Sequence, residues 1–295
     1  MTVYAPLYYQ KFHCLGGDCR HCCCVGWEVG IDEDALCRMA VVTGDFGERV
    51  RSAVDFEAGT FRLGERDRCP MLREDGLCDL ILHLGEDALP AICDEHPRYT
   101  HLLSRRTEVG LGMSCEEACR LLLESPLPIP LVPVGEDGEE ECPSSEEEDA
   151  VLALREECFA LLFGEGTLWE KEEALLRLAG GTSLPVEDFV ARLRALERLD
   201  GAWDGVLSRP LADPATHTEA GEAMLFYFLH RHLTAAPSVE DAAAAIRFAV
   251  LSRRAVSALS AGDGKDVLRA YSAEVEYSEE NTEALLSALR QRPLR

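Results

Sequence analysis

Cysteines are the residues of this 295-residue chain whose type and spacing could do chemistry, and eleven of the 13 lie between Cys14 and Cys119. Five of them fall in the eleven positions from Cys14 to Cys24, a stretch that also carries Gly16-Gly17. Thiolates spaced by two to four residues on a glycine-containing loop can converge on one centre. Single cysteines often serve as small buried hydrophobes, but that use does not explain so dense a run. The pattern therefore predicts a cysteine-ligated metal site.

The remaining ligands of such a site are expected further along the chain, at Cys69, Cys78, Cys93 and Cys115. Structural zinc favours two paired cysteine hooks or added histidines, and Cys19-x2-Cys22 is one hook without a clear second. Iron–sulfur clusters accept irregular spacing and a proline beside a ligand, as at Cys69-Pro70. We therefore favour iron–sulfur. Zinc stays open as the alternative, because spacing alone does not decide between them.

The charge balance of the chain limits its partners. There are 54 acidic and 29 basic side chains, for a formal net charge of −25. Such a surface repels phosphate backbones and anionic lipids, which argues against nucleic acid and membranes, whereas it attracts a lysine-rich protein. No leader and no apolar run of spanning length is visible, so a cytoplasmic location is expected. Thiols are kept reduced there, so we do not expect a disulfide framework.

Three regions are expected to position these residues, and the fold class they predict is mainly α. Residues 1–124 form an irregular, cysteine-rich metal-binding domain, much of it loop held by metal rather than by a large core. Residues 125–149 form a linker in which proline-rich, extended chain leads into an acidic run. Residues 150–295 form an all-helical domain, because the helical period of apolar residues takes over there.

Capping signals mark the helices of the second half. Ser145-Glu146-Glu147-Glu148 reads as a capping box that opens one helix, and Thr167-Leu168-Trp169-Glu170 opens a second. Gly180-Gly181 ends that second helix. Further helices are expected over residues 222–233, 238–262 and 281–290, short ones over 77–84 and 118–123, and a small hairpin over 57–63.

Across residues 8–123 the order of these motifs resembles the flagellin lysine-N-methylases. The resemblance is carried by Tyr8 and Phe12, Cys14-x4-Cys19-x3-Cys23-Cys24-x-Gly26-Trp27, Cys69-Pro70-x-Leu72, Gly76-Leu77-Cys78, Leu84-Gly85-Glu86, Cys93-x3-Pro97-Arg98 and Ser114-Cys115-x-Glu117-Ala118. The chain departs from the family pattern at two positions. Cys22 makes a triple cysteine where the pattern has a double, and Glu116 stands where a proline is expected.

This resemblance implies an enzyme with a cysteine-ligated [4Fe-4S] cluster that transfers a methyl group from S-adenosylmethionine to the ε-amine of lysines on flagellin. The ligand candidates carried over are Cys14, Cys19, Cys23, Cys24, Cys69, Cys78, Cys93 and Cys115. Eight thiolates exceed the four that one cubane cluster needs, so either some are structural or two centres exist. Adjacent Cys23 and Cys24 are expected to point in different directions, and Cys22 is set aside as an extra.

Methyl transfer to lysine needs a neutral amine, so a base or a desolvated pocket must be near the substrate. Asp94 and His96, beside Cys93, are the candidate bases, and Tyr8 is the candidate for lining the lysine channel. Trp27 and Arg98 are the candidates for holding the cofactor. Arg98 would bind the carboxylate of S-adenosylmethionine. Each of these residues also fits an ordinary loop, capping or salt-bridge role.

The glycine-rich strand–turn–helix that usually cradles an adenosyl group is not found in the sequence. If the chain uses S-adenosylmethionine, we expect the cysteine-rich region to bind it. A second hypothesis stays open alongside the enzyme. In it, zinc or an iron–sulfur cluster only stabilises the first half, and the helical half acts as a binding or scaffold module without catalysis.

Overall fold

The computed structural model describes residues 1–181, 184–214 and 220–290, and it divides the chain into two compact units. The unit that we call the cysteine unit comprises His13–Arg98 and Cys115–Glu117. The unit that we call the sheet–helix unit comprises Met1–Phe12, Tyr99–Ser114 and Ala118–Arg295. This division differs from the three predicted regions, because the chain passes between the units four times.

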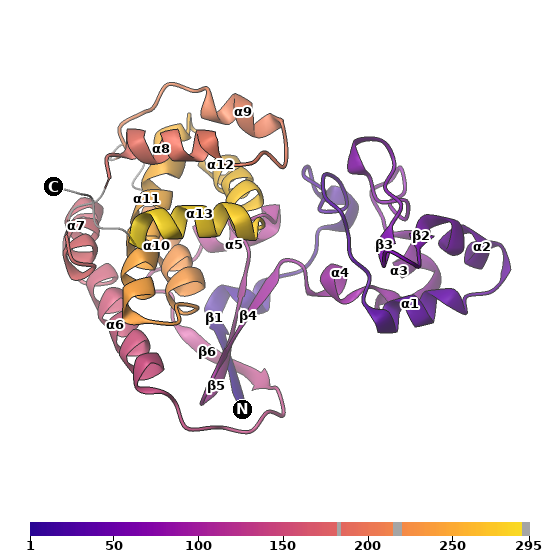
Figure 1. Cartoon of the computed structure of the whole chain (residues 1–295), viewed down its shortest axis with the longest axis horizontal. Coiled ribbons are helices and arrows are strands. Elements are labelled where there is room, and N and C mark those ends of the chain that lie inside the picture. Colours follow the sequence, from indigo (N-terminus) through magenta and orange to yellow (C-terminus); the bar gives the residue numbers. More distant parts are fainter. Residues whose placement is uncertain (182–183, 215–219, 291–295) are drawn as a thin grey trace. The chain divides into compact units, whose positions relative to one another are not determined.

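The sheet of the sheet–helix unit has four strands in the order β4-β5-β1-β6, seen in Figure 1. The strands are β1 (Thr2–Pro6), β4 (Arg98–Leu103), β5 (Arg106–Leu111) and β6 (Leu131–Glu136). β1 runs parallel to β5, with Tyr4 opposite Glu108, and antiparallel to β6. The predicted linker therefore contains an edge strand, which is where Pro133, lacking a backbone N–H, is tolerated.

The helices of this unit make the fold mainly helical, as predicted. They are α5 (Glu116–Leu123, whose first two residues belong to the cysteine unit), α6 (Glu146–Leu162), α7 (Leu168–Leu178), α8 (Val186–Ala195), α9 (Ala202–Leu207), α10 (Gly221–Phe228), α11 (Val239–Leu259), α12 (Gly264–Tyr271) and α13 (Glu279–Arg290). A 3-10 turn, η1 (Leu7–Lys11), and two π-helical turns, η5 (Leu229–Leu233) and η6 (Ser272–Glu276), complete the unit. Residues 150–295 are thus not an all-helical domain by themselves, because they share a unit with the sheet.

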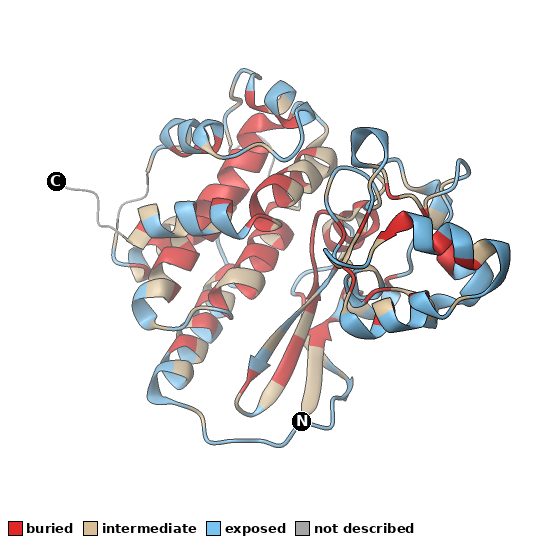
Figure 2. Cartoon of the chain, turned by 45° about the vertical axis from the view of Figure 1, so that its right-hand side comes forward, coloured by how far each residue is buried: buried red, intermediate tan, exposed pale blue. Residues whose placement is uncertain are grey.

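Both predicted capping sites begin helices, but only the second is a full capping box. The Ser145 side chain accepts the Glu148 N–H, while the Glu148 carboxylate accepts from Ser104 instead of closing the box. Thr167 and Glu170 exchange both bonds of a capping box. α11 is buried along most of its length and contacts α7, α8, α10, α12 and α13 (Figure 2). Its environment explains its alanine-rich sequence, because small side chains let neighbouring helices approach closely. Within the described ranges, no helix has the length and apolar character needed to cross a membrane.

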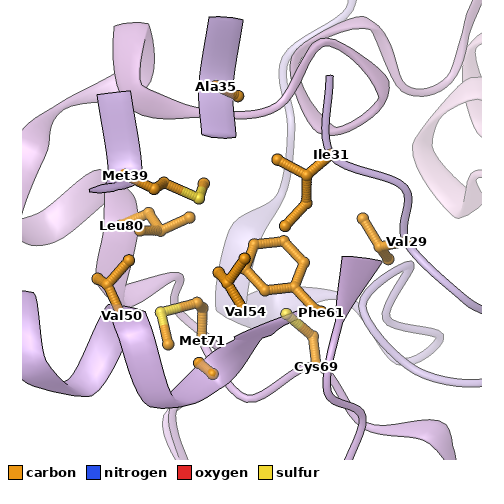
Figure 3. Packing of buried hydrophobic residues seen from close by; sticks show 11 residues of the cluster. Val29, Ile31, Ala35, Met39, Val50, Val54, Phe61, Cys69, Met71 and Leu80 are labelled. Carbon is orange, nitrogen blue, oxygen red and sulfur yellow. The ribbon is translucent and has the colours of Figure 1, made fainter. Parts of the chain in front are cut away.

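The cysteine unit has a hydrophobic core of its own, contrary to the expectation of loop held mainly by metal. Its elements are η2 (Gly16–Asp18), α1 (Glu33–Ala40), α2 (Gly44–Ala53), β2 (Val54–Asp55), β3 (Thr60–Phe61), η3 (Glu65–Asp67), α3 (Asp79–Leu84), η4 (Glu86–Ala88) and α4 (Ala91–Glu95). β2 and β3 pair as a hairpin, but the range predicted for it, 57–63, contains only its turn and second strand, because the first strand ends at Asp55. Figure 3 shows Val50, Val54, Phe61 and Met71 packed together, with Cys69 among them.

Candidate functional site

The triple cysteine of the cysteine unit forms one hydrogen-bonded group of thiols. The Cys22 sulfur accepts hydrogen bonds from Cys23 and then Cys24, which lower the pKa of Cys22. The same bonds raise the pKa of Cys23 and of Cys24. Cys23 is exposed whereas Cys24 packs against the hydrophobic core, so the two adjacent side chains have different surroundings although both lie in one turn. Cys22, which was set aside as an extra, is thus the member of the group whose pKa is lowered.

A second set of thiols borders the hydrophobic core. Cys69 is a member of that core, and Cys24, Cys78 and Cys93 pack against it. The Cys69 N–H donates to the Cys24 carbonyl at 2.9 Å, which fixes the two loops side by side. Burial, followed by the nearness of the Cys69 and Cys78 thiols, raises the pKa of Cys93 to about 12.

Backbone amides point at the sulfur of Cys69. Burial raises the pKa of its thiol, and N–H donors of Met71 and Leu72 partly offset that effect. The turn that aims these amides is closed by the Leu72 N–H bonding the Cys69 carbonyl at 3.1 Å, and Leu72 bridges to Cys78. Amide hydrogen bonds to sulfur stabilise thiolate charge and tune iron–sulfur and zinc sites.

A third set comprises Cys14, Cys19 and Cys115, outside the core. Burial and then the neighbouring Cys115 and Cys14 thiols raise the pKa of Cys19 to about 11. The two chain segments are tied by Arg20, whose backbone N–H and Nε donate to the Glu116 carboxylate at 3.1 and 2.9 Å. Glu116 is the residue that replaces the proline of the family pattern, and here it fastens the first cysteine loop to Cys115.

The donor chemistry suits a thiophilic metal, because it offers soft thiol ligands and amides aimed at sulfur. In residues 1–181, 184–214 and 220–290, no group of three or more Cys, His, Asp or Glu side chains is arranged to coordinate a metal ion. Binding would therefore require the thiols to reorient, as is usual for sites that form together with the metal. The arrangement fits iron–sulfur and zinc alike.

Four of the other candidate residues also lie in the cysteine unit, close to one another. The Trp27 Nε1–H donates to the Cys23 carbonyl at 2.7 Å, and the Trp27 ring meets the His96 ring edge-on at 5.6 Å between centroids. Burial, followed by the charge of Arg98, lowers the pKa of His96 to about 4. Arg98 Nη1 donates to the Asp94 carbonyl at 3.1 Å. His96 is thus neutral at pH 7, as a proton acceptor must be.

Asp94 lines an open pocket of about 440 Å³ on the same unit. Its other lining residues are Asp32, Asp34, Arg38, Glu86, Asp87, Leu89 and Ala91. Asp32 is occupied as a cap, because it accepts the Ala35 and Ala91 N–H groups. The pocket carries a strong excess of negative charge.

Tyr8 belongs to the other unit and is not grouped with these residues. It lies in η1, is 2% exposed, and its hydroxyl has no hydrogen-bond partner within the described part of the chain. Burial raises its pKa. Its neighbours include Tyr99, near a buried polar network with Glu108 and Arg155 that sequence reasoning missed. The available signal was a charge at Arg155 on the apolar stripe of α6 that includes Val151.

Three curated proteins with similar sequences are two named Lysine-N-methylase, from Salmonella typhimurium and Salmonella choleraesuis, and one named Flagellar biosynthetic protein FliU, from Salmonella muenchen. Each is 27% identical over 135 residues, or 43% of this chain. The match spans 33% of each lysine-N-methylase and 79% of the FliU protein. No family model matches the chain, and no solved structure matches it at the threshold of the search.

Proposed function

We propose that this chain is a protein-lysine N-methyltransferase that uses S-adenosylmethionine and a cysteine-ligated [4Fe-4S] cluster, with flagellin or a similar lysine-bearing protein as substrate. The observation that carries the proposal is the gathering of all eight candidate thiols in one compact unit. The distant similarity to proteins named Lysine-N-methylase supports the choice of reaction. A cytoplasmic location belongs to the proposal, because thiols stay reduced there.

The residues that would hold the metal are the thiols described above. Cys24, Cys69, Cys78 and Cys93 form the set at the core, and Cys14, Cys19, Cys23 and Cys115 form the outer set. Four thiolates suffice for one cluster, so the two sets have the ligands for one centre each or for one cluster and a structural site. When bound, a [4Fe-4S] cluster supplies a Lewis-acidic and redox-active centre.

The side chains near Cys93 would serve the substrate and the cofactor. The acidic pocket that contains Asp94 attracts a lysine side chain, as does the net charge of −25. His96, the predicted base, is neutral at pH 7, but its lowered pKa makes it a weaker acceptor of the ammonium proton than an ordinary imidazole. Trp27 offers an aromatic face for the adenosyl group, and Arg98 a cation for the cofactor carboxylate.

Anaerobic purification followed by metal analysis, a visible spectrum and a methyl-transfer assay tests the proposal. We expect a brown protein with about four or eight irons per chain, since each cubane holds four, and transfer of labelled methyl groups to flagellin lysines. Cys69→Ser should lose metal and activity. Cys142→Ser, which changes an exposed thiol outside both sets, should lose neither. Metal-replete protein that methylates no lysine-bearing protein would rule the proposal out.

The scaffold hypothesis is favoured by one observation, the position of Cys69 inside a hydrophobic core with three other thiols against it. Buried, closed sites of this kind often have a purely structural role. A colourless protein with stoichiometric zinc and no affinity for S-adenosylmethionine would decide for it.

A further inference from the structure

A groove borders the sheet of the sheet–helix unit, at a place that the proposed function does not use. β4 is an edge strand, because the strand order is β4-β5-β1-β6 (Figure 1). Beside it lies a pocket of about 370 Å³, which we call the β4 groove. Its lining comprises residues 100–103 of β4, Ser145, Glu148, Val151 and Leu152 at the start of α6, and residues 234–237 after η5. All of these residues belong to the sheet–helix unit, so the groove is complete within one unit.

The lining of the β4 groove suits an extended peptide. Four successive residues of β4 take part, so the strand presents its backbone edge to the groove as well as its side chains. The residues from α6 recur every three or four positions and therefore lie on one face of that helix. Extended peptides commonly bind by adding a strand to an exposed sheet edge, with alternate side chains entering pockets.

The backbone groups available for such pairing are those of Thr100 and Leu102. β4 and β5 are joined by a two-residue turn at 104–105. The residue before this turn, and every second residue upstream of it, therefore exchange hydrogen bonds with β5. The contact that a Cβ on Gly110 would make with Tyr99 agrees with this register. The N–H and C=O groups of Thr100 and Leu102 thus point away from β5, and the described residues offer them no other backbone partner.

The β4 groove also contains a hydrogen-bonding group that is not satisfied. His101 Nε2 is buried and has no hydrogen-bond partner in the described part of the chain. Burial, followed by the nearness of His230, lowers the pKa of His101 to about 3, so its ring is uncharged at neutral pH. The same burial opposes a cation at this place. A side chain that enters beside His101 would therefore be polar and uncharged, such as that of threonine.

Acidic residues surround the β4 groove. Residues 146–149, the first turn of α6, are all acidic, and Glu148 lies in the groove itself. The Ser104 N–H and hydroxyl donate to the Glu148 carboxylate at 3.0 and 2.7 Å, which fixes this turn at the end of β4. Three further glutamates, at 139–141, reach the same place, because the Cys142 N–H donates to the Ser104 carbonyl at 2.8 Å. Such a charge favours a peptide that carries lysines.

We propose that the β4 groove is a docking site for an extended, lysine-bearing segment of a partner protein, which pairs with Thr100 and Leu102 as an added strand. Because side chains alternate along a strand, every second residue of the segment enters the groove beside His101. The lysines occupy the positions between, where the acidic residues attract them. The binding needs no group of the cysteine unit. That the segment belongs to the protein to be methylated rests on the proposed function.

Hydrogen exchange of the full-length protein, with and without a peptide, tests the added strand. The probe is an acetylated and amidated peptide of alternating threonine and lysine. It should slow exchange of the Thr100 and Leu102 amides and leave β6, the other edge of the sheet, unchanged. The same peptide with methylated backbone nitrogens keeps its charge but cannot pair, so it should bind about 10-fold more weakly or worse. Equal binding of the two peptides, or an unprotected β4, would overturn the proposal.

Side-chain variants test the charge and the imidazole separately. Glu146→Gln with Glu147→Gln removes two charges at the start of α6 and should weaken binding of the peptide by about 5-fold at low salt. Glu187→Gln with Asp188→Asn is the matched control, since it removes two exposed acids from the first turn of α8 and should leave binding unchanged. His101→Phe should abolish the preference for threonine over valine in the peptide. Equal effects of the two double variants, or a preference that survives His101→Phe, would refute the assignment.

These binding measurements need no methyl donor, so they separate the docking site from the proposed function. Protection of β4 by the peptide, in a protein that methylates nothing, would keep the docking site and refute the proposed function. In an active enzyme, Glu146→Gln with Glu147→Gln should raise KM for the lysine-bearing protein and leave kcat unchanged. Methyl transfer by a protein whose β4 amides stay unprotected would overturn the docking site alone.

Discussion

Replacing Arg155 by methionine perturbs the charge balance on which the buried network depends. Arg155 and Glu108 are both fully buried, and they are joined by two hydrogen bonds. Removing one partner of a buried ion pair typically costs about 3 to 5 kcal/mol, because the other charge is left uncompensated. Arg106 and His230 still contact Glu108, so we expect the lower end, about 3 kcal/mol of unfolding free energy.

A double-mutant cycle with Glu108→Gln separates this charge effect from loss of packing. If the cost arises from an unpaired charge, Arg155→Met together with Glu108→Gln should be less destabilised than the sum of the single variants, by at least about 2 kcal/mol. Arg120→Met is the control. It breaks an exposed pair with Glu124 along α5 and should cost below about 0.5 kcal/mol.

Urea unfolding followed by far-ultraviolet circular dichroism measures these differences, because the long helices lie in the sheet–helix unit. Two results would refute the reasoning. One is a loss below about 1 kcal/mol in Arg155→Met, well under the range for a broken buried pair. The other is strict additivity of the two single variants, which would mean that the charges do not interact.

Three other perturbations have defined outcomes. Thr167→Ala removes the capping box of α7 and should cost about 1 kcal/mol in urea unfolding; no change would mean that the cap is replaced by water. Gly110→Ala should displace the Tyr99 ring, seen as a moved Tyr99 Cζ signal in NMR, whereas Gly135→Ala, where an added Cβ has open space, should leave that signal in place. Burial lowers the pKa of His101 to about 3 in the folded protein, so the unfolded chain binds a proton more readily than the folded one. The free energy of unfolding should therefore fall as pH drops below about 6.5, by up to about 2 to 3 kcal/mol at pH 4.5. His101→Asn should reduce the slope of the unfolding free energy against pH.

Removal of metal offers a further test, at the level of the cysteine unit. Because Val50 and Ala53 of α2 lie in a hydrophobic core, chelation should leave the amides of α2 protected against hydrogen exchange. Complete loss of that protection on chelation would show that metal, and not the core, holds the unit together.

The helices could be predicted from the sequence where their signals are local. Ser145, Thr167 and Ser238 each accept an N–H at the start of a helix, and that bond depends on residues three positions apart. The hairpin of β2 and β3 was found for the same reason. A short-range signal needs no knowledge of the rest of the chain.

The sheet could not be predicted in this way, because its pairings join distant segments. β1 pairs with β5 and β6, so Tyr4 meets Glu108 and Pro133 across more than a hundred residues. The same difficulty separated Tyr8 from the predicted site and hid the His230 contact with Glu108. The gathering of the candidate cysteines in one unit could be expected because their type and spacing show in the sequence itself, whereas the interaction of Cys22 with Cys23 and Cys24 depends on the turn that holds them.

The interruption of the sheet–helix unit by the cysteine unit sets an order of events during synthesis. β1 leaves the ribosome before both of its partner strands and has no partner until residues 106–136 follow. Meanwhile residues 13–98 emerge with their core and with every candidate thiol except Cys115. Domains generally fold as units while they are being made. If the core set binds metal as we propose, the nascent chain can acquire it before β1 has found a sheet, and Cys115 completes the outer set afterwards.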